Sequence, residues 1–285
     1  MSRKAVAIIK GGLGNQLFGY AAARAFALRS GRELFIDDAS GFVRDGYGRS
    51  FRLKHFPIEA RPAPAALRLG DPKGFRHKSK RSLNKVLPLK WKAYLPEKEG
   101  SLQLLDFDPV RDTVYLNGYW QNEAYFRDAT GKIREELQPP ALEKQGDLEL
   151  EQRMRDRNAV FVHVRRNRYS PRLGADYYKR SIELASEALD SPCFEVFGDD
   201  IAWARKQLDF GGRTVRFHEE ANDELVDFRL MTACKHAIVA NSSFSWWAAW
   251  LGPSLNGHVW TPKDPGWPVK PASGWTTVGN TLERD

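Results

Sequence analysis

Short apolar runs alternate along the chain with segments whose apolar residues recur at helical spacing. Residues 5–9 form an apolar, β-rich run that ends at Gly11 and Gly12, and residues 17–28 then show helical periodicity. A second short apolar run follows at 34–36. A strand, a helix and a strand in this order predict a parallel sheet that is covered by helices.

The second half of the chain repeats this alternation. Strands are predicted at residues 159–164, 193–197, 214–217 and 237–240. Helices are predicted at residues 176–189, 201–208 and 223–234, and an aromatic helix follows the last strand. These spacings are typical of a doubly wound α/β domain, so the sequence predicts an α/β fold in this half as well.

The middle of the chain is less regular. Between residues 40 and 112 the pattern blurs, although 114–116 predicts a strand and 122–137 a helix. Residues 139–158 are polar and charged and predict the border between two domains. A length of 285 residues suits two domains, which we expect at 1–150 and 151–285.

The positive charge is concentrated in one segment. The chain carries a net charge of +8, and residues 68–100 hold ten Lys or Arg against three acidic residues. Such a segment can contact an anionic membrane or an acidic ligand, or it can be a solvated face. Nucleic acid is a weaker candidate, because the charge is confined and no zinc-ligand set or RNA-stacking signature is present.

Two further features bear on the compartment. Cys193 and Cys234 stand far apart in apolar surroundings, which indicates reduced core thiols rather than a disulfide. The apolar run at 5–9 is too short for a signal-peptide core, and no segment approaches membrane-spanning length. We expect a cytoplasmic protein, with a peripheral position on the inner face of the membrane through residues 68–98.

Polar clusters follow four of the predicted strands. They are the glycine-rich turn 11–16, the segment 163–168 with its paired arginines, the acidic pair after 193–197, and the polar turn 241–245. Ligands of open α/β sheets bind beyond the carboxyl ends of the strands, so these clusters are expected to converge on a cleft between the domains.

Each cluster has a chemical interpretation and a structural one. The turn 241–245 opens a helix and predicts a phosphate seat, or a capped helix with core tryptophans. Arg165 offers a fork of donors to phosphate, or an inter-domain ion pair. The pair Asp199 and Asp200 can read a ribose diol or nucleobase, bind a divalent metal with diphosphate, or cap a helix.

Together these clusters resemble the motifs of family 11 glycosyltransferases, the inverting α-1,2-fucosyltransferases. The resemblance rests on five stretches in family order, namely Gly14 to Ala21, His163 to Arg166, Tyr177 to Ile182, Phe197 to Asp200, and Leu230 to Trp247. The last stretch, with its Asn-Ser-Ser-Phe-Ser-Trp-Trp core, is highly specific. The region that matches poorly is about residues 40–112.

The resemblance implies a GT-B-like enzyme with two Rossmann-like domains that face a cleft. The N-terminal domain would lie on the acceptor side, and the C-terminal domain would bind the nucleotide sugar. The implied reaction moves fucose from GDP-fucose to a galactoside hydroxyl in an α-1,2 linkage, with inversion, in bacterial-type surface glycan synthesis. No metal and no cofactor would be needed, and the acceptor would be a glycan, which includes lipid-linked glycans.

The same resemblance assigns roles to individual residues. Arg165 would neutralise the diphosphate leaving group, where preorganised donors stabilise developing charge. The expected catalytic residues are Arg165, His163 and Asn15. The expected donor-binding residues are Gly14, Gln16, Arg166, Asp199, Asp200, Asn241, Ser242, Ser243, Phe244 and Ser245. The candidates for the base that takes the acceptor proton are Asp37, Asp38, Asp176 and His163.

One position departs from the family pattern. The His-x-Arg-Arg stretch usually continues to an acidic residue, and here that position is Arg168. This change bears on the donor sugar, on the acceptor and on fine positioning. Two other functions therefore stay open: a transferase that uses another nucleotide sugar, and an inert relative that binds sugar nucleotides or glycans.

Overall fold

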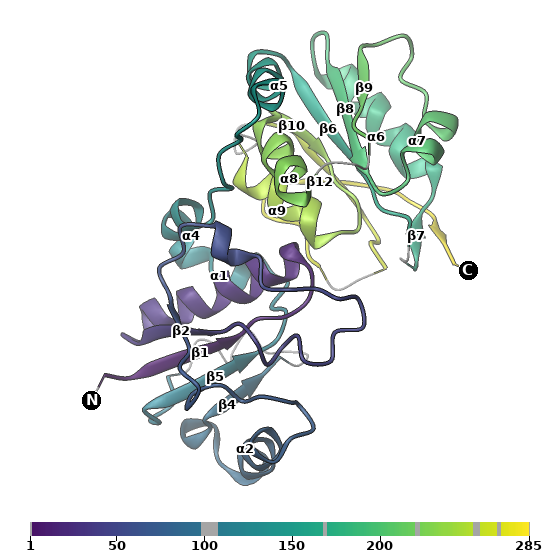
Figure 1. Ribbon diagram of the computed structural model, residues 1–285. Helices are drawn as coiled ribbons and strands as arrows, with labels where there is room; N and C mark the ends of the chain where they lie inside the picture. The colour runs from purple at the N-terminus through teal and green to yellow at the C-terminus, as the bar shows by residue number, and fades with distance from the viewer. Residues whose placement is uncertain are drawn as a thin grey trace. The chain divides into compact units, whose positions relative to one another are not determined.

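The computed structural model describes residues 2–97, 108–167, 170–219, 223–252, 257–266 and 269–284. The chain forms two compact units, Met1–Gln138 and Pro139–Asp285, each with its own parallel sheet (Figure 1). The division falls earlier than the expected border at residue 150, because α5 (Gln145–Asp156) belongs to the second unit. Its Glu151 carboxylate accepts a 2.6 Å hydrogen bond from Nε of Arg229 on α8 (Glu224–Ala233).

The first unit is built on a five-stranded parallel sheet with the strand order β3-β2-β1-β5-β4. Its strands are β1 (Lys4–Ile8), β2 (Glu33–Asp37), β3 (Arg61–Pro62), β4 (Tyr94–Pro96) and β5 (Thr113–Asn117). Its helices are α1 (Leu13–Arg29), α2 (Phe75–Val86) and α4 (Thr130–Glu136), and its short 3-10 turns are η1 (Leu53–His55), η2 (Leu89–Trp91), η3 (Glu123–Tyr125) and η4 (Arg127–Ala129).

Two glycines allow α1 to begin at Leu13, which is earlier than the predicted start at residue 17. Gly11 has φ +79°, a left-handed conformation that favours glycine, and Gly12 is the extended N-cap residue. The helix carries small residues on most of its sides, and Ala21, Ala22 and Ala23 are all fully buried. The chain can therefore turn sharply from β1 into a helix that packs closely on the sheet.

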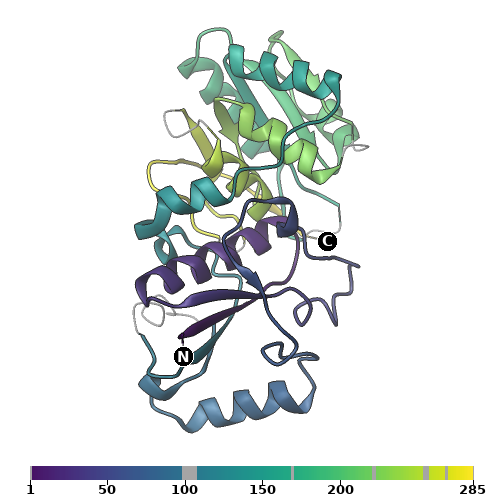
Figure 2. The same cartoon turned by 60° about the vertical axis from the view of Figure 1, so that its left-hand side comes forward.

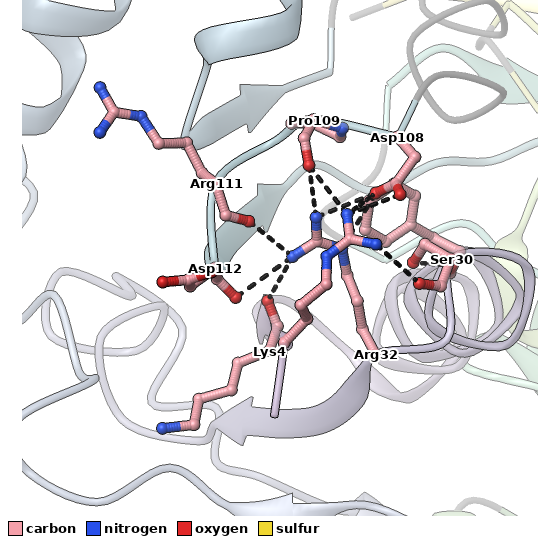
Figure 3. Close-up of polar contacts among 9 residues, drawn as sticks. Lys4, Ser30, Arg32, Asp108, Pro109, Arg111 and Asp112 are labelled. Carbon is pink, nitrogen blue, oxygen red and sulfur yellow. Dashed lines mark hydrogen bonds and ion pairs between the residues drawn. The ribbon is translucent and has the colours of Figure 1, made fainter. Parts of the chain in front are cut away.

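A buried arginine connects the turn between α1 and β2 to the segment before β5 (Figure 3). The side chain of Arg32 is fully buried in the turn between α1 and β2. Its guanidinium pairs with the Asp108 carboxylate at 2.9 Å and donates to the carbonyl oxygens of Pro109 at 2.6 Å and Arg111 at 2.9 Å. A buried charge is tolerated when it is paired and its donors are satisfied, so this residue is structural.

The first unit differs from the prediction in two places. The predicted helix 122–137 is broken into η3, η4 and α4, because Phe126 leaves the helical region with φ −138°. The blurred region contains the strands β3 and β4 and the helix α2, none of which the sequence pattern predicted. These strands are two or three residues long, too short for a periodic signal. Figure 2 shows α2 along its length, beside the sheet of this unit.

The second unit has a six-stranded sheet with the order β12-β11-β10-β6-β8-β9, and all of its strand pairs are parallel. Its strands are β6 (Ala159–Val164), β8 (Cys193–Gly198), β9 (Val215–Phe217), β10 (His236–Ile238), β11 (Val259–Pro262) and β12 (Thr276–Val278). A separate antiparallel pair joins β7 (Arg172–Leu173) to β13 (Leu282–Glu283). In chain order the six strands follow the 3-2-1-4-5-6 arrangement of a Rossmann fold.

Helices cover both faces of this sheet (Figure 1). The helices are α6 (Ala175–Ala188), α7 (Ile201–Gln207), α8 and α9 (Ser243–Leu251), together with α5. Side chains of α6 and α7 form one core with Val160, Val162 and Val164 of β6. Because strand side chains alternate, Phe161 and His163 point to the opposite face, where the His163 ring lies 5.7 Å from that of Phe244 on α9.

The fold is therefore α/β and GT-B-like, with two Rossmann-like units, as predicted. The strands β11 and β12 and the β7–β13 pair extend it beyond the predicted elements. Both cysteines are free thiols; Cys234 is buried, as expected, whereas Cys193 is half-buried.

Candidate active site

Three of the four predicted clusters follow neighbouring strands of the second unit. Arg165 follows β6, Asp199 follows β8, and the turn 241–245 follows β10, and β6 lies between the other two strands. The strand order reverses between β6 and β10, which is the topological switch point where open α/β sheets bind ligands. The tertiary structure thus brings together residues that are up to 80 positions apart in the sequence.

Arg165 and Asp199 form an ion pair at the carboxyl ends of β6 and β8. Nη1 of Arg165 lies 2.7 Å from Oδ2 of Asp199, and the Arg165 side chain is 37% exposed. Gly198 makes the approach possible, since a Cβ at this position would lie 2.1 Å from the Val164 carbonyl oxygen. The other carboxylate oxygen of Asp199 accepts the backbone N–H of Arg166 at 2.7 Å. Asp199 therefore fixes the backbone after β6 and holds the Arg165 guanidinium.

Arg166 points away from Arg165 and is held by the protein. Its guanidinium donates to the Leu173 carbonyl oxygen at 3.1 Å, pairs with Glu283 at 2.8 Å, and lies 4.0 Å from the centroid of the Trp203 ring. The side chain is only 10% exposed. These contacts join the end of β6 to α7 and β13, so the structure places Arg166 in a structural role.

Asp200 acts as a helix cap. Its side chain accepts the backbone N–H of Trp203 at 3.0 Å and begins α7. This is the structural interpretation that the sequence left open for the acidic pair. The two adjacent aspartates thus have different functions, because Asp199 turns to the end of β6 and Asp200 to the first turn of α7.

His163 is a neutral, buried imidazole. It is 6% exposed, and burial lowers its pKa to about 3, with a further contribution from the positive charge of Arg165. Within the described residues no hydrogen-bond partner reaches its Nδ1. A group with such a pKa is a weak proton acceptor at neutral pH, so the structure disfavours His163 as the base.

The turn 241–245 combines a cap with internal hydrogen bonds. Ser242 caps α9 by accepting the Phe244 N–H at 3.3 Å. The hydroxyl of Ser245 is fully buried and accepts the Ala240 N–H at 3.2 Å. The Asn241 amide donates to the carbonyl oxygens of Pro171 at 2.9 Å and Pro265 at 3.1 Å. Much of this polar turn therefore shapes the backbone, and Ser242 and Ser243 stand at the opening of the helix.

The fourth cluster belongs to the first unit. Gly14 and Asn15 lie in the first turn of α1, and Oδ1 of Asn15 accepts a 2.7 Å hydrogen bond from Gln121. This bond joins the first turn of α1, which follows β1, to the loop after β5, and the strand order of the sheet reverses between these two strands. Gln16 is 1% exposed and donates to the carbonyl oxygens of Gly11 and Ser50, each at 2.9 Å. The structure makes Gln16 a brace of the loop rather than a ligand-facing group.

The same edge carries polar residues that the sequence reasoning missed. Lys10 donates to Asn117 at 2.9 Å and lies over the Tyr119 ring at 4.9 Å. Burial lowers the pKa of Lys10, and the charge of Glu97 opposes that effect. Glu97 itself accepts the N–H groups of Tyr119 and Trp120. The polar residues directly after the predicted strand 114–116 could have indicated this part of the site from the sequence. Glu97 could not have been found in this way, because the strand β4 that positions it was not predicted.

The remaining candidate bases have structural partners. Asp37 is fully buried and accepts hydrogen bonds from the Ser40 hydroxyl at 2.6 Å and the Leu69 N–H at 3.0 Å. Asp38 pairs with Arg68 at 2.9 Å. Asp176 accepts both the N–H and the hydroxyl of Thr281, at 2.8 and 2.7 Å. The base for the acceptor proton stays unassigned.

Three further observations complete the site. Arg168, the departure from the family pattern, lies outside the described residues. Among the described residues no group of three or more His, Cys, Asp or Glu is arranged to hold a metal ion. Over the same residues, no helix has the length and apolar character that crossing a membrane requires.

Comparisons with known proteins place the chain in a family. Residues 89–258 match the model of glycosyl transferase family 11. The chain is 32% identical over 258 residues to the α-1,2-colitosyltransferase of Escherichia coli, which covers 86% of this chain and 87% of that protein. It is 28% identical over 289 residues to the O-antigen biosynthesis glycosyltransferase WbnK of Escherichia coli, at 90% and 92% coverage.

A solved structure supports the fold. The fucosyltransferase NodZ from Bradyrhizobium superposes with a TM-score of 0.56 at 17% sequence identity, over 89% of this chain and 93% of that one. At this identity the likeness concerns the fold alone. The family match and the 32% identical relative extend over most of the chain, and on that evidence the protein belongs to glycosyl transferase family 11.

Proposed function

We propose that the protein transfers a 6-deoxy sugar from its GDP-activated form to a galactoside hydroxyl, forming an α-1,2 linkage with inversion, and that the donor is GDP-fucose. The observation that carries the proposal is the meeting of Arg165, Asp199 and the start of α9 at the switch point of the second sheet. Family membership supports glycosyl transfer. The structural neighbour NodZ, an α-1,6-fucosyltransferase, has been solved after soaking with GDP-fucose.

Arg165 is proposed to stabilise the leaving group. The acceptor oxygen forms a bond to the anomeric carbon of the sugar, the bond from that carbon to the diphosphate oxygen breaks, and the hydroxyl proton leaves to a base or through water. Charge develops on the diphosphate, and a guanidinium offers two parallel donors to its oxygens. Of the two arginines after β6, Arg165 has the more exposed side chain, at 37% against 10% for Arg166.

The first turn of α9 is proposed to hold the phosphates. A helix begins there with backbone N–H groups that face its N-terminal end, together with the positive end of the helix dipole. Ser242 and Ser243 add hydroxyl groups. No metal is proposed, because Arg165 and this helix end already supply positive charge. Asn15, in the first unit, is proposed to contact the sugar or the acceptor on the strength of its motif.

The identity of the donor sugar is the open part of this function. One relative is an α-1,2-colitosyltransferase, and colitose is fucose without its 3-hydroxyl group. A site that hydrogen-bonds this hydroxyl rejects the deoxy sugar strongly, about 10⁴-fold or more, whereas a site that leaves it unbound discriminates weakly. GDP-colitose is therefore the specific alternative donor. The alternative to an enzyme is an inert relative that binds sugar nucleotides or glycans without transferring a sugar.

A donor series tests these alternatives. Turnover should be measured with GDP-fucose, GDP-colitose and GDP-mannose, with thermal shifts for GDP, UDP and dTDP. A ligand at one hundred times its Kd should stabilise the protein by about 2.7 kcal/mol. Stabilisation by UDP or dTDP without an effect of GDP would disprove the GDP assignment. Binding of GDP without transfer or hydrolysis of any donor would identify an inert relative.

The acceptor is proposed to be a surface glycan, carried on a lipid while it is assembled. The O-antigen relative supports a glycan of this kind. A lipid-linked acceptor requires the enzyme to work beside a membrane, and the basic segment 68–98 is proposed to face the anionic surface. Transfer to a free oligosaccharide and to the same glycan in vesicles should be compared, since equal rates would contradict the proposed need for a surface.

A further inference from the structure

The inner face of α2 is fixed to the edge of the first sheet. Asn84 accepts the Tyr94 N–H at 3.1 Å and donates to the Tyr94 carbonyl oxygen, so its amide continues the hydrogen bonding of the edge strand β4. The buried ring of His77 meets the Tyr94 ring edge-on at 5.5 Å. These two residues, seven positions apart, mark the side of the helix that faces the protein.

The opposite side of α2 presents apolar residues to solvent. Phe75 is 86% exposed, Leu83 58% and Val86 79%. Positions 75, 79, 83 and 86 fall on one side of a helix, away from His77 and Asn84. Trp91, in the turn η2 that follows, is 44% exposed. A surface helix normally turns its apolar stripe to the core, whereas the apolar stripe of this helix lies on the outer side, where the described protein leaves it uncovered.

Positive charge borders this apolar stripe. The helix contains five Lys or Arg and no acidic residue. Lys78 and Arg81 are both exposed, and helical spacing puts Lys78 nearer the stripe and Arg81 towards the side of His77. Two acidic residues of the surrounding segment are already paired, because Asp71 binds Arg44 at 2.7 Å and Glu97 accepts two backbone N–H groups. The exposed charge of Lys78 is therefore available to an outside partner.

We propose that the outer face of α2 inserts into the interfacial region of an anionic lipid bilayer, with Phe75, Leu83 and Val86 in the acyl boundary and Lys78 at the headgroups. An amphipathic helix with a basic flank and large apolar residues is suited to this position. A second copy of the chain fits less well, since two such helices would bring like charges together. The binding needs no nucleotide, so it stands apart from the choice of donor.

Co-sedimentation with vesicles tests the proposal on the full-length protein. Vesicles of phosphatidylcholine alone should be compared with vesicles that contain phosphatidylglycerol. The protein should bind the anionic vesicles preferentially. The variant Lys78→Ser should lose about fivefold in affinity, since one charge near the surface contributes about 1 kcal/mol. The variant Phe75→Ala/Leu83→Ala/Val86→Ala should lose at least tenfold, and salt should not abolish the remaining binding of the charge variant.

Matched controls come from exposed residues elsewhere. Lys206→Ser removes one exposed charge and Leu148→Ala removes an exposed apolar residue, and both proteins should bind like the wild type. Thermal shift with GDP should be unchanged in all variants, which separates loss of membrane binding from loss of fold. Equal binding to neutral vesicles, no binding to either, or an apolar variant that binds normally would each overturn the proposal. So would a wild-type dimer that the apolar variant converts to a monomer.

Discussion

The Arg165 guanidinium lies 2.7 Å from the Asp199 carboxylate, at the ends of two neighbouring parallel strands. Asp199 also accepts the N–H groups of Arg166 and Asn167, at 2.7 and 3.2 Å. The carboxylate thus holds the loop after β6 and keeps the Arg165 fork in one orientation. A diphosphate, with more negative charge than a single carboxylate, can compete for that fork.

Replacing Arg165 should impair catalysis without unfolding the protein. Loss of one key donor to the developing charge costs about 2.7–4 kcal/mol, so Arg165→Ala should lower kcat about 10²–10³-fold. Arg165→Lys should also be poor, because a single ammonium cannot replace the planar fork. The control is Arg205→Ala, which removes an exposed, ion-paired arginine of the same unit and should leave kcat unchanged. Near-normal turnover of Arg165→Ala would remove the residue from the mechanism.

Arg166→Ala should act mainly on stability. The change removes a hydrogen bond to Leu173, the pair with Glu283 and the stacking on Trp203. Hydrogen bonds to charged groups contribute about 1.5–3 kcal/mol, and each kcal/mol lowers Tm by about 2–4 °C in a protein of this size. Glu283→Gln should lower Tm less, since its carboxylate is half exposed. Calorimetry that finds an unchanged Tm for Arg166→Ala would contradict the structural role.

His163 should make stability depend on pH in the acid range. Its pKa is about 3 in the folded protein and about 6.5 when unfolded, so the unfolded state binds the extra proton between these values. The contribution of His163 is therefore complete above about pH 6.5 and declines as the pH falls towards 3, by up to about 1.4 kcal/mol per pH unit. The free energy of unfolding of the wild type minus that of His163→Gln should show this slope. A difference independent of pH would mean that His163 titrates normally.

Substitutions of Asn15 and Gln16, neighbours in the segment 11–16, should have different effects on activity and on stability. Gln16→Ala leaves the buried Gly11 carbonyl oxygen without this donor, at a cost of about 1–3 kcal/mol, and it also removes the part-buried hydrogen bonds to the Ser50 carbonyl oxygen and the Arg52 N–H. Asn15→Ala removes one hydrogen bond to Gln121 and should mainly lower kcat/KM. Thermal melts and kinetics of both variants should show opposite patterns. A loss of activity without loss of stability in Gln16→Ala would restore it as a ligand-binding residue.

Activity should survive removal of divalent metals. Positive charge for the diphosphate is proposed to come from Arg165 and the start of α9, and Asp200 is engaged as a helix cap. The test is the rate of transfer in excess EDTA, compared with the rate after Mg²⁺ or Mn²⁺ is added back. Abolished transfer that either metal restores would show that the acidic pair has a metal-binding role.

The sequence by itself determined much of the architecture. The order of strands and helices in the second half, the parallel sheets and the family motifs all follow from local features, because apolar periodicity and glycine turns act within a few residues. The run after β10 predicted the start of α9, and Gly11 and Gly12 predicted the turn into α1. The family assignment also came from these motifs.

The tertiary structure decided which polar residues of each motif are available to a ligand. Strand pairing brought Asp199 to Arg165 across 34 positions, while side-chain alternation turned Arg166 to Trp203 and Glu283. The sequence could not separate these neighbours, because their partners lie in distant segments and a buried polar group takes whatever partner the fold supplies. The sequence also could not predict the exposed apolar stripe of α2, because the contact of this helix with β4 decides which of its sides faces solvent.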